Sequence, residues 1–213
     1  MRINLGCGAT PTDGWINYDN SLTQYLVRRP VICNLVEFLG LLDQRQQSYL
    51  EFAKSHSIFF ADAVRKIPVP DESVDLLYTS HMLEHLDRNE AKLFLDQAKR
   101  VLKQSGVLRI AIPDLRMIIN DYMLDGDADK FVSATLLTIP KPQGLFQRIK
   151  AAVVGGRHHH WMYDDKSLTK LIRENGFEKV YTLVAGQTGI ADVGNLNLYE
   201  RHEESIYVEA TRG

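Results

Sequence analysis

The stretch INLGCGATPTDGWINYDNS, residues 3–21, decides the fold. An apolar run leads into two glycines, Gly6 and Gly8, and a short segment then leads into a second apolar run that ends at Asp19. Glycines directly after a buried strand let a bound ligand lie close to the backbone. A dinucleotide-binding loop has a third glycine, and Pro11 occupies that position here. A phosphate-binding loop is not supported either, because no Gly-Lys-Ser/Thr follows.

Short apolar runs alternate with helical patterns along the chain. The clearest helix has its apolar residues on one face between positions 91 and 102, with Asp87 as N-cap, Glu90 three positions later and Gly106 after its end. Five buried strands, each ending near Gly, Asp, Ser or Pro, are predicted at residues 2–5, 15–18, 58–61, 74–79 and 107–112. This alternation predicts a parallel sheet in an α/β fold.

The C-terminal part is predicted to add one helix and two strands. The helix begins at Asp164 or Asp165 and ends at Gly176. The strands follow at residues 179–184 and 205–210, so we expect the last part of this sequence to be β structure.

Two segments interrupt the alternation. Residues 22–54 have helical spacing at Leu35, Phe38, Leu39 and Leu42, which we interpret as a helix packed on the core. The alternative is that this segment covers the sheet edge or a bound ligand. Residues 131–163 contain no acidic residue, and their basic and histidine side chains are Lys141, Arg148, Lys150, Arg157 and His158 to His160. We expect one domain over residues 1–213, with insertions at 22–54 and 131–163.

The composition is that of a soluble globular protein, with 45% apolar residues, 24% charged residues and a formal net charge of −2. This charge argues against general nucleic-acid binding. Cys7 and Cys33 form neither a disulfide framework nor a paired metal motif, which predicts a reducing, cytoplasmic location. No run approaches the roughly 18 apolar residues of a membrane span, and the first residues lack the apolar run of a signal peptide.

Polar residues end three predicted strands at the carboxyl edge of the sheet, where open α/β sheets bind ligands. Asp19 ends the second strand, and its carboxylate can accept both hydroxyls of a ribose laid over the glycine loop. Asp62 follows the third strand and can accept from an adenine amino group, and Ser80 and His81 end the fourth. These strand ends predict a site for a nucleoside without a pyrophosphate.

Five stretches together resemble the class I S-adenosylmethionine-dependent methyltransferases of type 11, and the resemblance spans nearly the whole chain. They are NLGCG at 4–8, WINYD at 15–19, FADAVRKIPVPDESVDLLYTSHMLEHL at 60–86, AKRVLKQSGVLRIAIPDL at 98–115 and HHHWMYDDKSLTKLIRENGF at 158–177. The resemblance implies a three-layer Rossmann-like fold whose seven-stranded sheet is mostly parallel, with an antiparallel last strand. It also implies S-adenosylmethionine as cofactor and S-adenosylhomocysteine as product.

The resemblance further implies where the cofactor binds. Gly6 and Gly8 lie against its methionine part, and Asp19 holds its ribose. Asp62 with Ala63 frames the adenine. Ser80 and His81 flank the sulfonium. The complete predicted cofactor-binding set is Leu5, Gly6, Cys7, Gly8, Asp19, Asn20, Ala61, Asp62, Ala63, Ser80 and His81.

The sequence departs from the common family pattern near its start. Six residues separate Gly8 from Trp15, whereas a parallel crossover needs about a dozen, so the first helix is shortened or absent. No helical segment precedes the first strand, and residues 22–54 are left to close over the cofactor. Both features resemble a branch associated with bacterial surface polysaccharide synthesis. We therefore expect the methyl acceptor to be a hydroxyl of a sugar or other small molecule in glycan biosynthesis.

Transfer to an oxygen requires a group that removes its proton, and histidine has a suitable pKa. The predicted catalytic residues are His81, His159 and Asp114, the last of which could orient such a base or bind a sugar hydroxyl. Purely structural roles for these residues stay open as alternatives. Asp114 could only cap the following helix, residues 158–160 could form a solvated loop, and His85 could simply cap or pack. Trp161 and Tyr163 are candidates either for stacking on a sugar or base or for the core.

The basic residues of 131–163 predict an acceptor that carries phosphate or carboxylate, such as a nucleotide sugar or a lipid-linked sugar phosphate. The alternatives are a loop that faces solvent and, at residues 145–154, an amphipathic basic helix that rests on an anionic membrane surface.

Two rival functions remain. His81-Met82-Leu83-Glu84-His85 matches the HxxEH pattern of zinc proteases. That pattern needs a helix and a third ligand, and no downstream acidic ligand is evident, so no metal is expected. The other rival is a nucleoside-binding module that has lost catalysis and acts as a partner protein.

Overall fold

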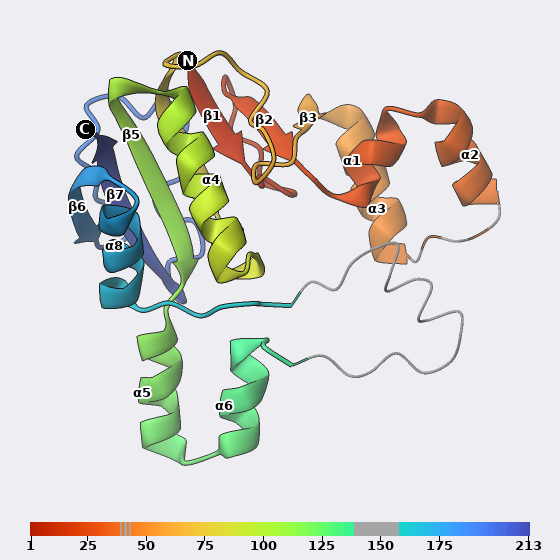
Figure 1. The fold of residues 1–213 in the computed structure, drawn as a ribbon. Coiled ribbons are helices and arrows are strands. Elements are labelled where there is room, and N and C mark those ends of the chain that lie inside the picture. Colours follow the sequence, from red (N-terminus) through yellow and green to blue (C-terminus); the bar gives the residue numbers. More distant parts are fainter. Residues whose placement is uncertain (39, 41, 43, 139–157) are drawn as a thin grey trace.

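A computed structural model of the chain describes residues 1–38, 40, 42, 44–138 and 158–213. The centre is one sheet of seven strands in the order β3-β2-β1-β4-β5-β7-β6 (Figure 1). Every pair from β3 to β5 is parallel, and β7 is antiparallel to both of its neighbours, as predicted. The strands are β1 (Arg2–Leu5), β2 (Ile16–Asp19), β3 (Ile58–Phe60), β4 (Val74–Ser80), β5 (Leu102–Pro113), β6 (Phe177–Leu183) and β7 (Ser205–Arg212).

The helix between β4 and β5 begins where the sequence predicts. The Asp87 side chain accepts from the backbone N–H groups of Asn89 and Glu90, and the Glu90 side chain completes the capping box. The helix ends at Val101, five positions before Gly106, and Gly106 lies inside β5, so it does not cap the helix as its predicted place after the end suggested. The described helices are α1 (Leu22–Val27), α2 (Pro30–Phe38), α3 (Gln44–Ser55), the short 3₁₀ helix η1 (Leu83–His85), α4 (Arg88–Val101), α5 (Leu115–Asp125), α6 (Ala128–Thr135) and α8 (Asp165–Glu174).

Strand pairing explains the early end of α4. Leu102 already pairs with Val74 of β4, so the chain becomes extended as soon as the helix ends. A Cβ on Gly106 would lie 2.9 Å from the carbonyl oxygens of Val74 and Lys103, which only glycine avoids. Gly106 therefore allows close approach within the sheet instead of ending the helix.

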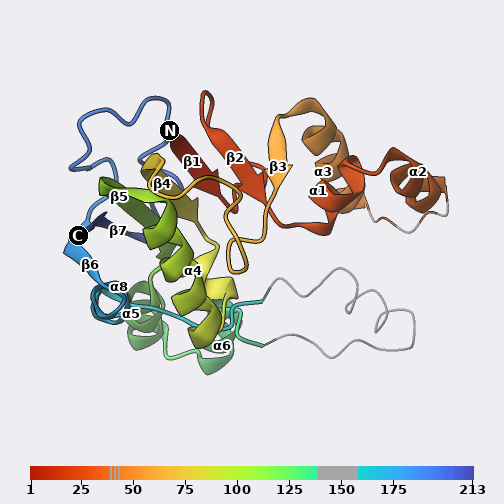
Figure 2. The same ribbon diagram turned by 45° about the horizontal axis from the view of Figure 1, so that its top comes forward.

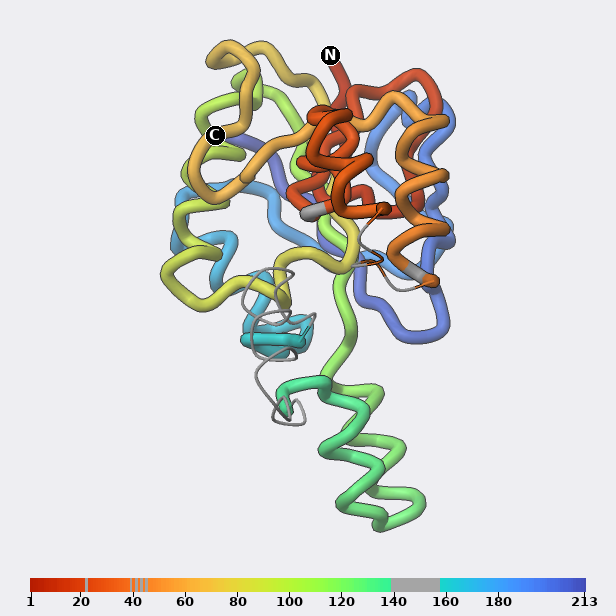
Figure 3. The backbone as a smooth tube through the Cα atoms, turned by 90° about the vertical axis from the view of Figure 1, so that its right-hand side faces the viewer, coloured from red at the N-terminus to blue at the C-terminus, as the bar shows by residue number. Residues whose placement is uncertain are grey.

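Helices α4 and α8 cover one face of the sheet (Figure 3). The apolar stripe of α4 is fully buried, and α8 is capped at its start by Asp164, whose side chain accepts from the Ser167 N–H. The main core lies between these two helices and the strands. Its helical members are Ala91, Phe94, Leu95, Ala98 and Val101 from α4, and Leu168, Leu171 and Ile172 from α8.

The opposite face is covered by the segment between β6 and β7, residues 184–204, in place of a crossover helix. No helix forms in the connection between β1 and β2, which confirms the shortened first crossover. Leu196 packs with Trp15, Leu76 and Tyr207 in a second core cluster on this face. The segment also contacts the start of the chain, where the Arg2 guanidinium donates to Asp192 at 2.5 Å. Figure 3 shows this segment, in blue, on the side away from α4.

Helices α1, α2 and α3 extend the molecule beyond the β3 edge (Figure 2). They form a small core of their own, in which Leu26, Cys33 and Leu50 are buried together. The expectation of a helix packed on the main core is wrong for α2, since Leu35 and Phe38 are 55% and 87% exposed. Covering the sheet edge, the alternative interpretation, describes this segment better. Leu39 lies outside the described residues.

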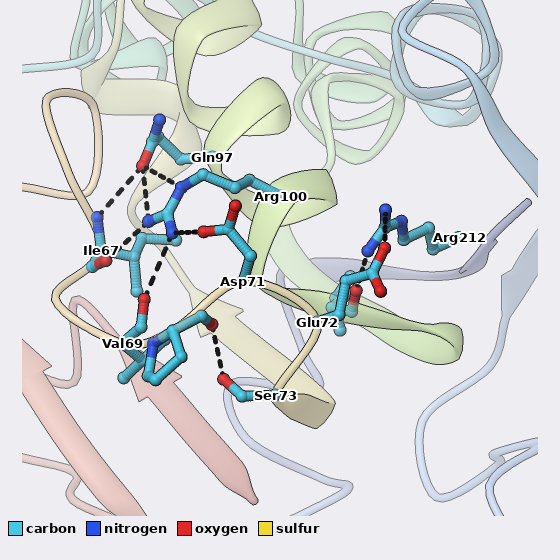
Figure 4. A network of polar contacts seen from close by, with 10 residues as sticks. Ile67, Val69, Asp71, Glu72, Ser73, Gln97, Arg100 and Arg212 are labelled. Carbon is cyan, nitrogen blue, oxygen red and sulfur yellow. Dashed lines mark hydrogen bonds and ion pairs between the residues drawn. The ribbon is translucent and has the colours of Figure 1, made fainter.

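The connection between β3 and β4 is fixed to α4 by one guanidinium. Arg100 donates to the carbonyl oxygens of Ile67 and Val69, at 2.7 and 3.2 Å, and to Asp71 at 2.5 Å (Figure 4). Gln97 accepts from Arg100 and from the Ile67 N–H. Because Asp62 begins this connection, the contacts limit how far it can move from the sheet.

A buried ion pair ties the 184–204 segment to the sheet. Arg109 of β5 and Glu209 of β7 are opposite each other in the ladder, at most 1% exposed and 2.5 Å apart. Arg109 also donates to the Gln187 carbonyl, and the Glu209 carboxylate accepts from the Thr188 hydroxyl and the Gly189 N–H. The pair therefore holds the start of the covering segment as well as two strands.

Removing one charge of this pair should cost stability. We expect Glu209→Gln to lower the free energy of unfolding by about 3–5 kcal/mol, because it leaves the Arg109 guanidinium buried without its counter-charge. Urea denaturation measures this, with the exposed Glu203→Gln as a control within about 0.5 kcal/mol of the wild type. Equal midpoints for the two variants would contradict the ion pair.

Candidate active site

The glycine loop forms a tight turn after β1. Gly6 and Gly8 have φ angles of +67° and +50°, in the left-handed region that favours glycine. A Cβ on Gly6 would lie 2.7 Å from Cγ of Met82, so this position has no room for a side chain. A Cβ on Gly8 would meet nothing within 4 Å, which leaves the backbone there open to a ligand. The Cys7 N–H donates to the Tyr18 carbonyl and joins the loop to β2.

Asp19 holds this loop against β2. One carboxylate oxygen accepts from the Gly8 N–H at 3.0 Å, and the other accepts from the Ser21 N–H at 2.7 Å. A carboxylate offers about four lone-pair positions, so each oxygen keeps capacity for another donor. Asp19 is thus a buried acceptor at the end of β2, beside the glycine loop.

The insertion reaches the same loop. The Tyr49 hydroxyl of α3 donates to the Gly8 carbonyl at 3.1 Å. Burial raises the pKa of this hydroxyl, with the Asp19 charge as a second cause, so Tyr49 is a neutral donor. This contact brings residues 22–54 to the glycine loop, and their closing over the cofactor stays a prediction. Tyr49 was not singled out by sequence.

The other predicted cofactor residues line the same sheet edge. Asp62 follows β3 and forms a turn in which its carboxylate accepts from the N–H groups of Val64 and Arg65. Leu5, Cys7 and Ala61 are buried, Ala63 and Ser80 are half-buried, and Asn20 is exposed. The structure brings together the ends of β1, β2, β3 and β4, as the prediction requires.

His81 adopts a left-handed backbone conformation, with φ of +49°, directly after β4. Its side chain is buried, with Nε2 2.7 Å from the Ser205 hydroxyl and Nδ1 3.4 Å from Oε1 of Glu84. Both ring nitrogens of His81 thus lie beside other groups of the protein, Ser205 and Glu84. Strained backbone outside glycine is concentrated at functional sites.

Glu84 is the centre of a histidine cluster. Its carboxylate is 1% exposed, and Nε2 of His85 and Nε2 of His159 lie 4.0 and 3.9 Å from Oε1. The Glu84 carbonyl accepts from the N–H groups of His160 and Trp161, which fixes the segment after residue 157 beside η1. His159 is buried, so the solvated-loop interpretation is wrong for that residue. Burial lowers its pKa, although the Glu84 charge opposes this, and the imidazole is therefore neutral.

Asp114 caps α5, because its side chain accepts from the Arg116 N–H at 2.9 Å. It also lines an open hollow of about 480 Å³ at the same sheet edge, together with Arg116, Asp165, His202 and Ser205. Burial raises the pKa of the Asp114 carboxyl. The capping interpretation is thus confirmed, and the residue also borders a space that can hold a ligand.

The two candidate stacking aromatics have different environments. Tyr163 is fully buried in the main core, whereas Trp161 is 43% exposed with the Arg88 guanidinium 5.2 Å from its ring centre. Only Trp161 is available to a ligand. Lys141, Arg148, Lys150 and Arg157, on which the phosphate-bearing acceptor depends, lie outside the described residues, as do residues 145–154.

Residues 36–110 match the family model described as a methyltransferase domain. This part of the chain is therefore similar to a methyltransferase domain. This match confirms the predicted enzyme class, an S-adenosylmethionine-dependent methyltransferase, and with it the cofactor. It spans the sequence from α2 to β5, so the glycine loop, Asp19, Asp114 and His159 lie outside the matched residues.

Solved structures share the fold of this methyltransferase. A methyltransferase from Methanosarcina mazei is 14% identical with a TM-score of 0.51, and the match covers 99% of this chain and 91% of that one. A Thermotoga maritima methyltransferase is 15% identical with a TM-score of 0.50, over 99% and 81% of the two chains. A Pyrococcus horikoshii protein is 16% identical, also with a TM-score of 0.50, over 99% and 82%. These likenesses confirm the predicted fold class.

No curated protein matches the methyltransferase in sequence. Among the helices that the structure describes, none is both long enough and apolar enough to cross a membrane.

The polar residues that sequence analysis overlooked are Tyr49 and Ser205, and Glu84 was weighed only as part of a protease motif. The available sequence signal for Glu84 was its place between two histidines, His81 and His85, in one short motif.

The buried thiols should be unreactive in the folded methyltransferase. Burial, the Asp19 charge and the Glu200 charge raise the pKa of Cys7 to about 12, and burial raises the pKa of Cys33. At pH 8 only about one Cys7 side chain in ten thousand is a thiolate, the form that reacts. We expect no reaction with Ellman's reagent in buffer and two thiols per chain in guanidinium. Rapid reaction of the native protein would contradict the buried glycine loop.

Proposed function

We propose that this methyltransferase transfers the methyl group of S-adenosylmethionine to a hydroxyl of a sugar or other small molecule in glycan biosynthesis. The observation that carries the proposal is the arrangement along one sheet edge. The glycine loop and Asp62 follow β1 and β3, Asp19 ends β2, and an open hollow with both polar and apolar lining lies beyond the end of β5. The cofactor and the acceptor would therefore meet near the end of β4.

The cofactor half fits a nucleoside joined to an amino acid. The open backbone at Gly8 admits the methionine part, and the spare lone pairs of Asp19 accept the ribose hydroxyls. Asp62 and Ala63 border the adenine position, held by the contacts of Arg100 to the same connection. Ser80 and His81, at and directly after the end of β4, would flank the sulfonium.

The acceptor half fits a compound rich in hydroxyl groups. Carboxylates of Asp114 and Asp165, the Arg116 guanidinium and the Ser205 hydroxyl offer both donors and acceptors in the hollow. Asp114 is the candidate general base, since a carboxyl with a raised pKa is closer to working pH than an ordinary aspartate. His81 supports the same hollow through its contact with Ser205.

The chemical step needs little from the protein beyond alignment and proton removal. The acceptor oxygen attacks the methyl carbon in line with the carbon–sulfur bond. As the new carbon–oxygen bond forms, that bond breaks and its electrons remain on sulfur, which leaves neutral S-adenosylhomocysteine. The proton of the acceptor hydroxyl passes to the base.

Three narrower features belong to the same proposal. The branch resemblance supports a role in surface polysaccharide synthesis in the cytoplasm. The basic residues of 131–163 support an acceptor that carries phosphate, with peripheral membrane contact as the alternative use of the segment. Formal net charge supports the absence of a nucleic-acid partner.

Asp19 tests the cofactor half. We expect Asp19→Asn to weaken binding of S-adenosylhomocysteine at least tenfold by calorimetry, because each charged hydrogen bond to a ribose hydroxyl is worth about 1.5–3 kcal/mol. The control is Asp13→Asn, an exposed aspartate on the same β1–β2 connection. Unchanged binding in Asp19→Asn, with the wild-type melting temperature, would refute this ribose contact.

Asp114 tests the acceptor half. A screen of sugars and nucleotide sugars for S-adenosylhomocysteine release identifies an acceptor, and Asp114→Asn should then lower kcat by about 10²–10⁴-fold. Its affinity for S-adenosylhomocysteine should stay the same. Asp165→Asn, in the same hollow, should change KM more than kcat. Cofactor binding without release for any acceptor class would favour the inactive binding module.

A further inference from the structure

The Glu84 carboxyl group is buried and has no hydrogen-bond partner among the described residues. Both of its oxygens are inaccessible to solvent, and neither makes a hydrogen bond to the part of the chain that the structure describes. Leaving a carboxylate desolvated and unpaired costs several kcal/mol. Native structures avoid this cost with a counter-ion or donors at hydrogen-bond distance. We therefore expect a hydrogen-bond donor or a cation next to the Glu84 carboxyl group.

Besides His81, two imidazoles lie near this carboxylate, with Nε2 of His85 and of His159 about 4 Å from Oε1. Nδ1 of His85 lies 2.8 Å from the His158 carbonyl, which can only accept, so this nitrogen carries the proton. Nδ1 of His159 lies 3.2 Å from the Met162 sulfur, a weak acceptor. In His85 the proton on Nδ1 leaves a lone pair on Nε2. The His159 ring also interacts with the Thr135 backbone, and its Nε2 has a lone pair when Nδ1 carries the proton. Metal-binding histidines commonly adopt this tautomer. One ring nitrogen binds the metal, and the N–H of the other donates to a neighbouring group that fixes the ring.

The spacing matches an ion held between the three groups. The ligand atoms of Glu84, His85 and His159 all lie within 4.8 Å of one another, and each Nε2 is about 4 Å from Oε1. That is too far for hydrogen bonds between them. Ligands bound to one ion at about 2.1 Å lie roughly 3–3.5 Å apart, so the ligand atoms need to close by roughly 0.5–1.5 Å.

We propose that Glu84, His85 and His159 bind one divalent transition-metal ion, such as Zn²⁺, at the acceptor side of the methyltransferase site. Two histidines and one carboxylate leave coordination positions open. His85 is 36% exposed and gives the site its access to solvent, while the other two ligands are buried. Sequence analysis expected no metal because no third ligand was evident, and His159 is that ligand.

This site differs from the HxxEH arrangement of zinc proteases. In that arrangement both motif histidines bind the metal from one helix, whereas here Glu84 and His85 lie in the short η1. The first motif histidine, His81, directs Nε2 to Ser205 and contacts Glu84 through Nδ1 at 3.4 Å. His81 therefore positions the carboxylate ligand and lies outside the three-ligand group.

The role of the ion rests on the proposed methyl transfer. A bound divalent ion orients an acceptor hydroxyl and lowers its pKa. Since η1 follows directly after the end of β4, the ion would lie near the proposed sulfonium position. The aspartate of the hollow, Asp114, would then receive a proton that the metal has made easier to remove.

Cobalt tests the site without an acceptor. Protein treated with a chelator and then titrated with Co²⁺ should bind one equivalent, give visible d–d absorption bands and gain thermal stability. We expect His85→Gln and Glu84→Gln to weaken this binding more than tenfold. The control is His160→Gln, an exposed histidine next to His159, which should bind Co²⁺ as the wild type does.

The outcomes are separable. Absence of stoichiometric Co²⁺ binding, or equal loss in His85→Gln and His160→Gln, would overturn the metal site. Calorimetry with S-adenosylhomocysteine on the same samples tests the proposed function separately. Co²⁺ binding without cofactor binding would leave the metal site and remove the proposed methyl transfer, whereas the reverse result would leave methyl transfer without a metal.

Discussion

The ten residues that join β1 to β2 are too few to cross the sheet with a helix, and much of the molecule is arranged around this constraint. The face that such a helix would cover is apolar, with Trp15, Leu76 and Tyr78 upon it. Exposing these side chains to water would be costly. Residues 184–204 cover them instead, and the Arg109–Glu209 pair fixes that segment to the sheet centre. The short connection also keeps the glycine loop tightly against Asp19.

The strands end in two chemically different groups along one edge. At β1, β2 and β3 the backbone is open and the side chains are hydrogen-bond acceptors, which suits a nucleoside. At β4 and β5 the side chains are histidines and carboxylates supported from α5, β7 and the segment after residue 157. The parallel sheet fixes the distance between these groups, because its strands cannot slide without losing their ladder bonds. The residues at the ends of β1 to β3 and those at the ends of β4 and β5 can therefore change independently on the same sheet.

Local patterns predicted most of the fold. The strands and the start of α4 follow from apolar periodicity and from Asp87 with Glu90, which interact within a single turn. Gly106 was misplaced because its role depends on pairing with Val74, which no local pattern contains. The covering segment at 184–204 and the exposed α2 were missed for the same reason. Nothing in their own residues specifies which distant surface they contact.

The site shows the same division. The position of Asp19 beside the glycine loop was predictable, because the ends of neighbouring parallel strands meet at one edge of the sheet. The association of Glu84 with His159 was not, since 74 residues separate them and the contact depends on the Glu84 carbonyl bonding to the backbone of His160 and Trp161. Sequence alone suggested a protease motif there, and only the three-dimensional arrangement separates His81 from the other two histidines.

The covering segment has a consequence for biosynthesis. A ribosome adds about 5–20 residues per second, so residues 184–204 emerge on the order of ten seconds or more after β1. Until then the apolar face that contains Trp15 has no permanent cover. Contacts between such distant parts of a chain form slowly. The N-terminal strands are therefore synthesised first, but their apolar face is covered last. During that interval chaperones or transient contacts are needed to keep the nascent chain from aggregating.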